Sequence, residues 1–179
     1  MDEPSIEKEL RQKKKSVLAY GEGEDEKIFL RHLVRLYCRS DKVAVATGSA
    51  GGGDPTYMLC RAIRARRGVK RDYEFILLDT DKPWAEEMKE NAKTEGIELI
   101  GNDPCFESFL LDILECSESL KGLGTWKCKA LFEKEYAHGN FTEEECLRLF
   151  PKSLLNSARE RNEKLNKIVK IIEGDTSIQ

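Results

Sequence analysis

Short apolar segments with the composition of buried strands alternate with helical patterns from Ser16 to Ile100. The expected strands are Ser16–Tyr20, Val43–Thr47, Tyr73–Leu78 and Ile97–Ile100, and the expected helices are Glu26–Tyr37, Thr56–Arg67 and Ala85–Glu95. Repeated strand, helix, strand units with short helices give a mainly parallel sheet flanked by helices, so the pattern predicts an α/β fold. Sheets of this kind bind ligands at the carboxyl ends of their strands.

The rest of the chain is predicted to be helical. Helical patterns cover Glu107–Glu115, Thr142–Leu149 and Leu154–Ile172, with a looser stretch around Gly122 to Trp126. We expect a single domain over residues 1–179, with a core at about 16–115 and a helical C-terminal part at about 116–179. The apolar stripe of Leu154–Ile172 suits the chain's own sheet and a second copy equally well, which leaves a homodimer as one alternative.

The composition indicates a globular chain. Hydrophobic residues make up 40% and charged residues 35% of the 179 residues, and no run approaches the roughly 18 apolar residues of a membrane-spanning helix. The N-terminal segment is polar throughout, unlike a signal peptide, so we expect a cytoplasmic protein with no membrane partner. The six cysteines lie far apart with no CxxC pair, which favours reduced thiols over a structural zinc site.

Acidic residues follow two of the expected strands. Glu22 lies at the end of the first strand, and Asp79 and Asp81 lie at the end of the third. The carboxyl ends of parallel strands share one edge, and residues two apart on an extended chain project to the same side, so these three carboxylates are expected to lie together. Mg²⁺ or Mn²⁺, which prefer oxygen ligands, would offset their mutual repulsion.

Each acidic segment also has an ordinary explanation. Glu24–Glu26 is the kind of acidic first helical turn that the helix dipole favours, and Asp79–Asp81 is typical of a turn before a proline. A metal site is the interpretation that accounts for both segments at once.

Two short motifs and one longer segment resemble those of known proteins. Glu22-Gly23 followed by Glu26, and then Asp79-Thr80-Asp81, resemble the acidic signature of TOPRIM domains, which have a Rossmann-like fold. The segment NDPCFESFLL, which begins at Asn102, is similar to the Asn-Pro-Cys-Phe-Glu segment of RloB-like proteins.

The resemblance to RloB-like proteins extends to Gly48–Pro55, which is rich in glycine, and to the basic segment Ser157–Leu165. Two positions depart from the pattern. Asp103 is inserted between the Asn and the Pro of the usual motif, and Asp25 stands where such proteins often have Thr or Ser.

This resemblance implies a TOPRIM-type, metal-dependent nuclease from a bacterial antiphage or restriction-associated system. Glu22, Asp79 and Asp81 would then be the catalytic and metal-binding acids, with Glu22 as candidate general base, Glu26 as an accessory acid and Glu107 as a contributor from the next helix. The implied cofactor is Mg²⁺ or Mn²⁺, and the implied reaction is hydrolysis of a phosphodiester bond.

The implied substrate is DNA or RNA, with transfer RNA among the candidates, and a regulatory protein such as a defence-system ATPase is an implied partner. The alternative from another functional class is a noncatalytic module that keeps the fold and binds nucleic acid or protein.

Basic residues suited to phosphate contacts gather in two places. The nucleic-acid-binding candidates are Arg61, Arg64, Arg67 and Lys70 in one helix and its exit, and Lys127 and Lys129 after Trp126. A solvated helical face explains the first group equally well. Trp126 has the chemistry to stack a base, but core packing is the expected role. The glycine-rich Gly48–Gly53 lacks the Gly-Lys-Ser/Thr ending of a phosphate loop, which favours a flexible loop over the metal site.

Overall fold

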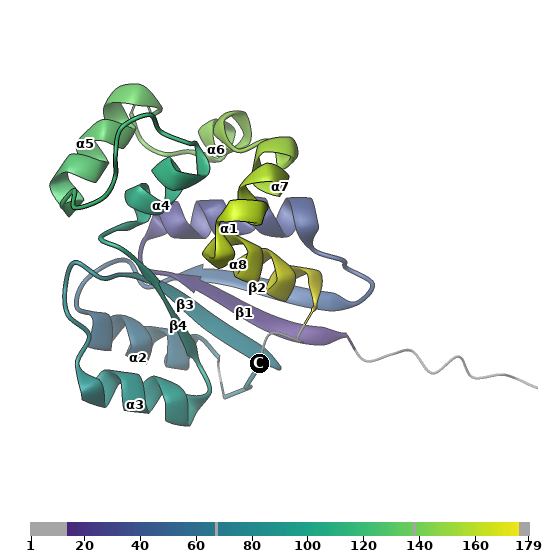
Figure 1. Cartoon of the computed structure of the whole chain (residues 1–179). Helices are drawn as coiled ribbons and strands as arrows, with labels where there is room; N and C mark the ends of the chain where they lie inside the picture. The colour runs from purple at the N-terminus through teal and green to yellow at the C-terminus, as the bar shows by residue number, and fades with distance from the viewer. Residues whose placement is uncertain (1–13, 67, 138, 176–179) are drawn as a thin grey trace, which may run out of the picture.

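The structure is a computed structural model that describes residues 14–66, 68–137 and 139–175. In this part of the chain, parallel strands form a sheet in the order β2-β1-β3-β4 (Figure 1). The strands are β1 (Lys15–Gly21), β2 (Val43–Ser49), β3 (Tyr73–Asp79) and β4 (Glu98–Asn102). The helices are α1 (Glu24–Tyr37), α2 (Pro55–Ala65), α3 (Glu86–Glu95), α4 (Phe106–Ile113), α5 (Thr125–Glu135), α6 (Glu143–Leu149), α7 (Lys152–Arg161) and α8 (Glu163–Glu173). The predicted α/β fold with a parallel sheet and a helical C-terminal part is confirmed.

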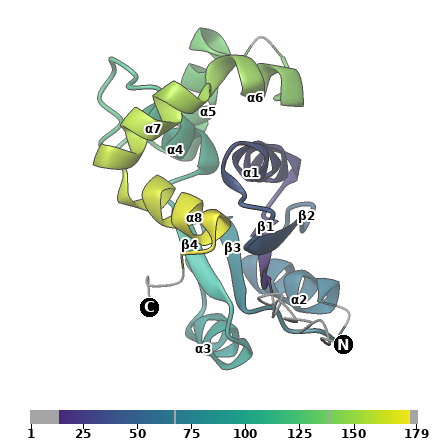
Figure 2. The ribbon, with the colours of Figure 1, turned by 90° about the vertical axis from the view of Figure 1, so that its right-hand side faces the viewer.

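Each face of the sheet has its own hydrophobic core, because successive side chains of a strand point to opposite faces. In β3, Phe75 and Leu77 pack on the face that α1 and α8 cover, whereas Ile76 and Leu78 pack on the face that α2 and α3 cover. Figures 1 and 2 show these two pairs of helices on opposite sides of the sheet. By the same alternation, Asp79 belongs to the face of Phe75 and Leu77.

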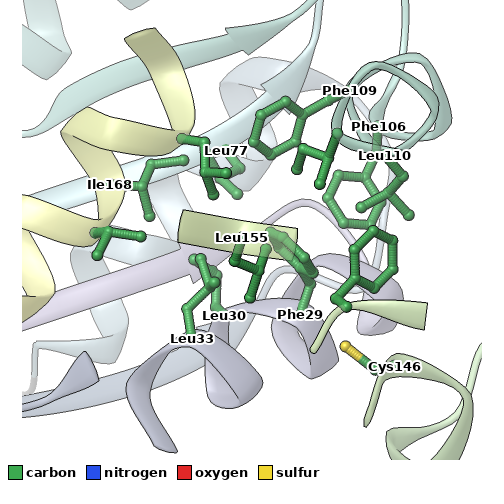
Figure 3. Packing of buried hydrophobic residues seen from close by; sticks show 14 of the residues in the cluster. Phe29, Leu30, Leu33, Leu77, Phe106, Phe109, Leu110, Cys146, Leu155 and Ile168 are labelled. Carbon is green, nitrogen blue, oxygen red and sulfur yellow. The ribbon is translucent and has the colours of Figure 1, made fainter. Parts of the chain in front are cut away.

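Phe29 of α1 joins the sheet to the C-terminal helices. Its ring meets those of Phe150, Phe106 and Phe109 edge to face, with centroids 5.3, 5.8 and 6.0 Å away, and Figure 3 shows the two α4 rings beside it. Such pairs add about 0.5–1.5 kcal/mol each beyond the area that they bury. The packing fixes α4 against the first turns of α1.

Local sequence signals explain where the central helices begin and end. The Asp54 carboxylate accepts a hydrogen bond from the Thr56 amide at 2.9 Å, and Pro55 occupies the first helical position, so α2 begins one residue earlier than expected. Gly96 ends α3 in the left-handed conformation, with φ of 72°.

The prediction of one long helical segment over Leu154–Ile172 is wrong, because Asn162 divides it. Asn162 has extended dihedrals, and its side-chain oxygen accepts a hydrogen bond from the Leu165 amide at 2.8 Å, which makes it the N-cap of α8. The apolar residues of α8 are buried in the same core as β1 and α1. The stripe is therefore covered within the chain itself.

Helix α5 was not predicted, because the loose stretch noted around Gly122 to Trp126 covers only its first two residues. Its buried residues are Cys128, Leu131 and Phe132, which form a narrow apolar face. None of the described helices combines the length and apolar composition that crossing a membrane requires.

A buried ion pair connects α2 to β3 and α3. The Arg66 guanidinium donates hydrogen bonds to Glu74 and, at 2.6 Å, to Glu95, and the Arg66 and Glu74 side chains are both almost fully buried. Arg66 lies within the basic run from Arg61 to Arg71, but its side chain has a structural role.

Arg66→Ala is expected to lower the free energy of unfolding by about 3–5 kcal/mol, because the substitution leaves the Glu74 carboxylate buried without its partner. Urea unfolding followed by circular dichroism measures the change. The matched control is Lys70→Ala, since Lys70 is exposed and lies 3.9 Å from Glu95, and its expected cost is below about 1 kcal/mol. Equal effects of the two substitutions would contradict the structural role of Arg66.

Candidate functional site

Glu22 is fixed at the junction of three segments beyond the end of β1. One of its carboxylate oxygens accepts a hydrogen bond from the Asp79 amide at 3.0 Å, and its carbonyl oxygen accepts one from the Gly52 amide at 2.9 Å. Gly21, which precedes it, has no room for a side chain, because a Cβ there would lie 2.5 Å from the Cβ of Glu26. The chain can therefore turn from β1 into α1 while keeping both acids close to the sheet.

The acids at the start of α1 have different roles. Glu24 is exposed and pairs with Lys27 at 2.7 Å, as expected of an ordinary first helical turn. Glu26 is only 6% exposed, and its carboxylate accepts a hydrogen bond from the Gly23 amide at 2.8 Å. Burial, reinforced by the negative charges of Glu22 and Asp25, raises the pKa of Glu26 to about 7.

Asp79 is a buried acid of this edge with an unpartnered carboxylate oxygen. Its residue is 8% exposed, and its Oδ1 atom is buried without a hydrogen-bond partner among the described residues. Burial is the main reason that its pKa rises to about 8, and the charges of Glu22, Glu26 and Glu107 raise it further. The structure therefore brings three predicted site acids, Glu22, Glu26 and Glu107, together around Asp79.

Glu107 reaches the same edge from the first turn of α4. One of its carboxylate oxygens accepts a hydrogen bond from the Lys129 ammonium at 2.9 Å, and the other, Oε2, is buried without a partner in the part of the chain that the structure describes. The predicted phosphate-binding residue Lys129 is thus paired with an acid of the site.

Asp81 lies at the rim, apart from the buried acids. The extended strand ends at Asp79, and the amides of Thr80 and Asp81 both donate to the carbonyl of Pro104. Since the chain is no longer extended at Asp81, the alternation that was expected to align it with Asp79 does not reach it. Its exposed carboxylate accepts a hydrogen bond from the Thr125 hydroxyl at 3.3 Å.

Asn102 and Lys164 belong to the site but were not identified as site residues from the sequence. Asn102 pairs with Asp79 in the β3–β4 register and is completely buried. Its side-chain oxygen accepts a hydrogen bond from the Lys164 ammonium at 3.3 Å, while its Nδ2 has no partner among the described residues. Burial lowers the pKa of Lys164. The signal for Asn102 was its place at the head of NDPCFESFLL. Lys164 lies in the basic segment Ser157–Leu165, but no sequence pattern connected it to the acids.

The other predicted phosphate-binding residues lie on the surface, and Lys70, three residues before β3, lies at the opposite, amino-terminal edge of the sheet. Arg61 and Arg64 are exposed on α2, Lys127 is exposed on α5, and Lys70 lies beside Glu95. Arg67 lies outside the described residues. The acids and these cations occur on neighbouring segments, but the structure gives the cations of α2 no contact with Glu22 or Asp79.

The glycine-rich loop runs beside the acids. Gly51, Gly52 and Gly53 have φ of 78°, 76° and 126°, values that side chains rarely adopt. The Lys82 ammonium donates to the carbonyl of Gly53 at 3.4 Å. The Gly52 amide donates a hydrogen bond to the Glu22 carbonyl, and this contact holds the loop beside Glu22 at the carboxyl edge of the sheet.

The expectation that Trp126 packs in the core is wrong, because Trp126 is 76% exposed. It occupies the first turn of α5, whose buried face begins at Cys128. The helix therefore turns the indole to solvent.

A divalent cation fits the chemistry of these residues. Asp79 and Glu107 each have a buried carboxylate oxygen without a partner among the described residues, and the Glu22 carboxylate lies beside Asp79. The pKa values of Asp79 and Glu26 are raised. Both observations indicate that nearby positive charge does not balance the carboxylates. Within the described ranges, however, no three His, Cys, Asp or Glu side chains are arranged to hold an ion alone. Mg²⁺ often binds through one or two carboxylates, with water and substrate oxygens as its other ligands.

No family model, curated protein or solved structure matched this chain in our comparisons. The resemblance to TOPRIM domains and RloB-like proteins therefore stays a prediction that rests on the motifs.

Asp79→Asn is expected to raise the melting temperature of the metal-free protein, and to raise it more at pH 8 than at pH 5. The folded-state pKa of Asp79, about 8, lies above the ordinary pKa of an aspartate in the unfolded chain. As the pH rises from that ordinary pKa to about 8, Asp79 therefore destabilises the folded protein increasingly. The amide keeps the shape of the side chain without the charge. Differential scanning fluorimetry in EDTA measures both proteins.

The same instrument tests the cation. A cation present at 100 times its dissociation constant stabilises the folded protein by about 2.7 kcal/mol, which raises the melting temperature of a chain of this size by roughly 5–10 °C. Mg²⁺ or Mn²⁺ is therefore expected to raise the melting temperature of the wild type and of Glu24→Gln, but not that of Asp79→Asn. An equal rise in all three proteins would place the bound ion elsewhere.

Proposed function

We propose that this chain is a nuclease of TOPRIM type that uses Mg²⁺ or Mn²⁺ to hydrolyse phosphodiester bonds in DNA or RNA. The observation that supports the proposal is the enclosure of Asp79, with an unpartnered oxygen, among Glu22, Glu26 and Glu107 at the carboxyl edge of a parallel sheet. Parallel α/β sheets bind ligands at this edge. The resemblance to RloB-like proteins adds the proposal of a cytoplasmic role in antiphage or restriction-associated defence.

In this proposal Asp79, Glu22 and Glu107 supply the oxygen ligands of the ion, and Asp81 lies at the rim where substrate enters. When bound, the ion supplies electrostatic stabilisation of the charge that develops on the phosphoryl group. Mg²⁺ is commonly bound through carboxylates together with substrate phosphate oxygens. This agrees with an edge at which the described residues do not form a complete set of protein ligands.

The remaining residues of the edge position charge and protons. Glu26 lies among these acids as an accessory acid, with a pKa raised to about 7 in the absence of an ion. Glu22 is the proton acceptor that the resemblance implies. Lys129 keeps a positive charge next to Glu107. The glycine-rich loop leaves its backbone free of side chains where a phosphate would approach.

A noncatalytic binding module is the second candidate. It is favoured by the outward position of Asp81 and by the lack of a ready-made ion-binding group in the described part of the chain. Such a module would bind its partner equally well in EDTA and after loss of Asp79.

Asp79→Asn and Glu22→Gln are each expected to lower metal-dependent cleavage by at least about 100-fold, because each removes a charged oxygen ligand. The assay uses plasmid, single-stranded DNA and bulk transfer RNA with Mg²⁺ or Mn²⁺, and it identifies the substrate class at the same time. Glu24→Gln is the matched control, since Glu24 lies in the same helical turn but faces solvent, and its cleavage rate should match that of the wild type. Cleavage that persists in both site variants would refute the proposed function.

A further inference from the structure

Trp126 is an unusual surface residue. Tryptophan is normally largely buried in a folded chain, yet Trp126 is the most exposed large hydrophobic residue in the described ranges. The other exposed aromatic residue among them is Tyr57, at 52%. The position of these two rings relative to the acids therefore needs an explanation.

Helix α5 contacts acids of the site on both sides of Trp126. We call the carboxyl edge of the sheet with its acids the acidic edge: Glu22, Glu26, Asp79, Asp81 and Glu107. Thr125, the residue before it, donates its hydroxyl to the Asp81 carboxylate at 3.3 Å, and Lys129, three residues after it, donates to Glu107 at 2.9 Å. Cys128 is buried between them and fixes the rotation of the helix. These contacts hold the start of α5 beside Asp81 and Glu107, and the Trp126 indole on that turn is exposed to solvent.

The second ring lies on the other flank of the edge. Tyr57 is in the first turn of α2, where a Cβ on Gly53 would lie 3.6 Å from its ring, and the Arg61 guanidinium lies 5.7 Å from the ring centroid. A Cβ on Gly51 would in turn lie 3.8 Å from Arg61. Figure 1 shows α5 and α2 on opposite sides of the carboxyl ends of the strands. Each flank thus offers an exposed ring with a cation nearby, Lys127 on one side and Arg61 on the other.

We infer that Trp126 is a stacking platform for an unpaired base, and that the substrate of the acidic edge is single-stranded nucleic acid. The inference rests on the proposed function for the identity of the reaction, but the binding mode follows from the rings and cations. An exposed indole stacks on the face of a base, which a single strand offers and an intact duplex hides within its own stack. Lys127 and Arg61 then contact the phosphates on either side of the acids.

A protein partner fits this surface less well. Docking surfaces for proteins bury a contiguous apolar core, whereas the other exposed large hydrophobics of the described chain, Val69 and Leu147, lie on other segments. The neighbours of Trp126 on either side are a threonine and a lysine.

The test is fluorescence anisotropy with labelled oligo(dT), oligo(U) and a blunt duplex of equal length, in EDTA and in an Asp79→Asn background so that no cleavage occurs. Both single strands are expected to bind more tightly than the duplex. Trp126→Ala should weaken single-strand binding by about 10–100-fold, whereas Trp126→Phe should retain most of it. Leu147→Ala, which removes an exposed hydrophobic side chain from α6, is the matched control and should have no effect.

Single-strand binding that is unchanged in Trp126→Ala, or a duplex that binds as tightly, would overturn the inference, and absence of binding to every probe would do so as well. The two proposals fail separately. If Trp126 proves irrelevant while Asp79→Asn abolishes cleavage of the metal-loaded protein, only the platform is wrong. If binding depends on Trp126 while cleavage ignores Asp79, only the nuclease assignment is wrong.

Discussion

The parallel register of β1, β3 and β4 is the constraint on which the rest of the site depends. It places the end of β3 beside the segment that follows β1, so that the Asp79 amide can donate to the Glu22 carboxylate, and it sets Asn102 directly opposite Asp79. Alternation along β3 then assigns the Asp79 side chain to the face of Phe75 and Leu77, where α1 and α4 bring Glu26 and Glu107. The aromatic packing around Phe29 keeps those two helices in place.

The acidic edge is costly to the fold. Buried carboxylates with raised pKa values destabilise a folded protein at neutral pH, since the unfolded chain ionises them freely. The Lys129 ammonium offsets part of that charge by pairing with Glu107, and the Lys164 ammonium donates a hydrogen bond to the Asn102 side chain, which lies opposite Asp79. The negative charge that these lysines leave uncompensated would be balanced by a bound cation, which in turn would bind a substrate phosphate. Functional sites are where proteins commonly retain such unfavourable arrangements.

Much of the fold could be predicted from the sequence, because each strand contains a short apolar run that a glycine or an aspartate follows. The observed strand bounds differ from expectation by at most two residues. The break at Asn162 was missed because the apolar stripe continues in register on both sides of it, and only the side-chain cap reveals the interruption. Helix α5 was missed because its apolar face is only three residues wide.

The site was predictable where strand ends determine it and less so where loops do. Glu22, Glu26, Asp79 and Glu107 meet as the motifs indicated, whereas Asp81 depends on a turn whose amides bond to Pro104. The orientation of Trp126 depends on which face of α5 is buried, and Lys164 comes from a distant helix. Neither follows from local pattern.

The acids buried at this edge are proposed to form a divalent-cation site. The most direct measurement is an anomalous difference map from a crystal soaked in Mn²⁺, collected at the manganese absorption edge. We expect a peak within coordination distance of Asp79, with Glu22 or Glu107 as a further ligand. A well-ordered edge with no peak at Asp79, or a peak only at other carboxylates, would contradict it.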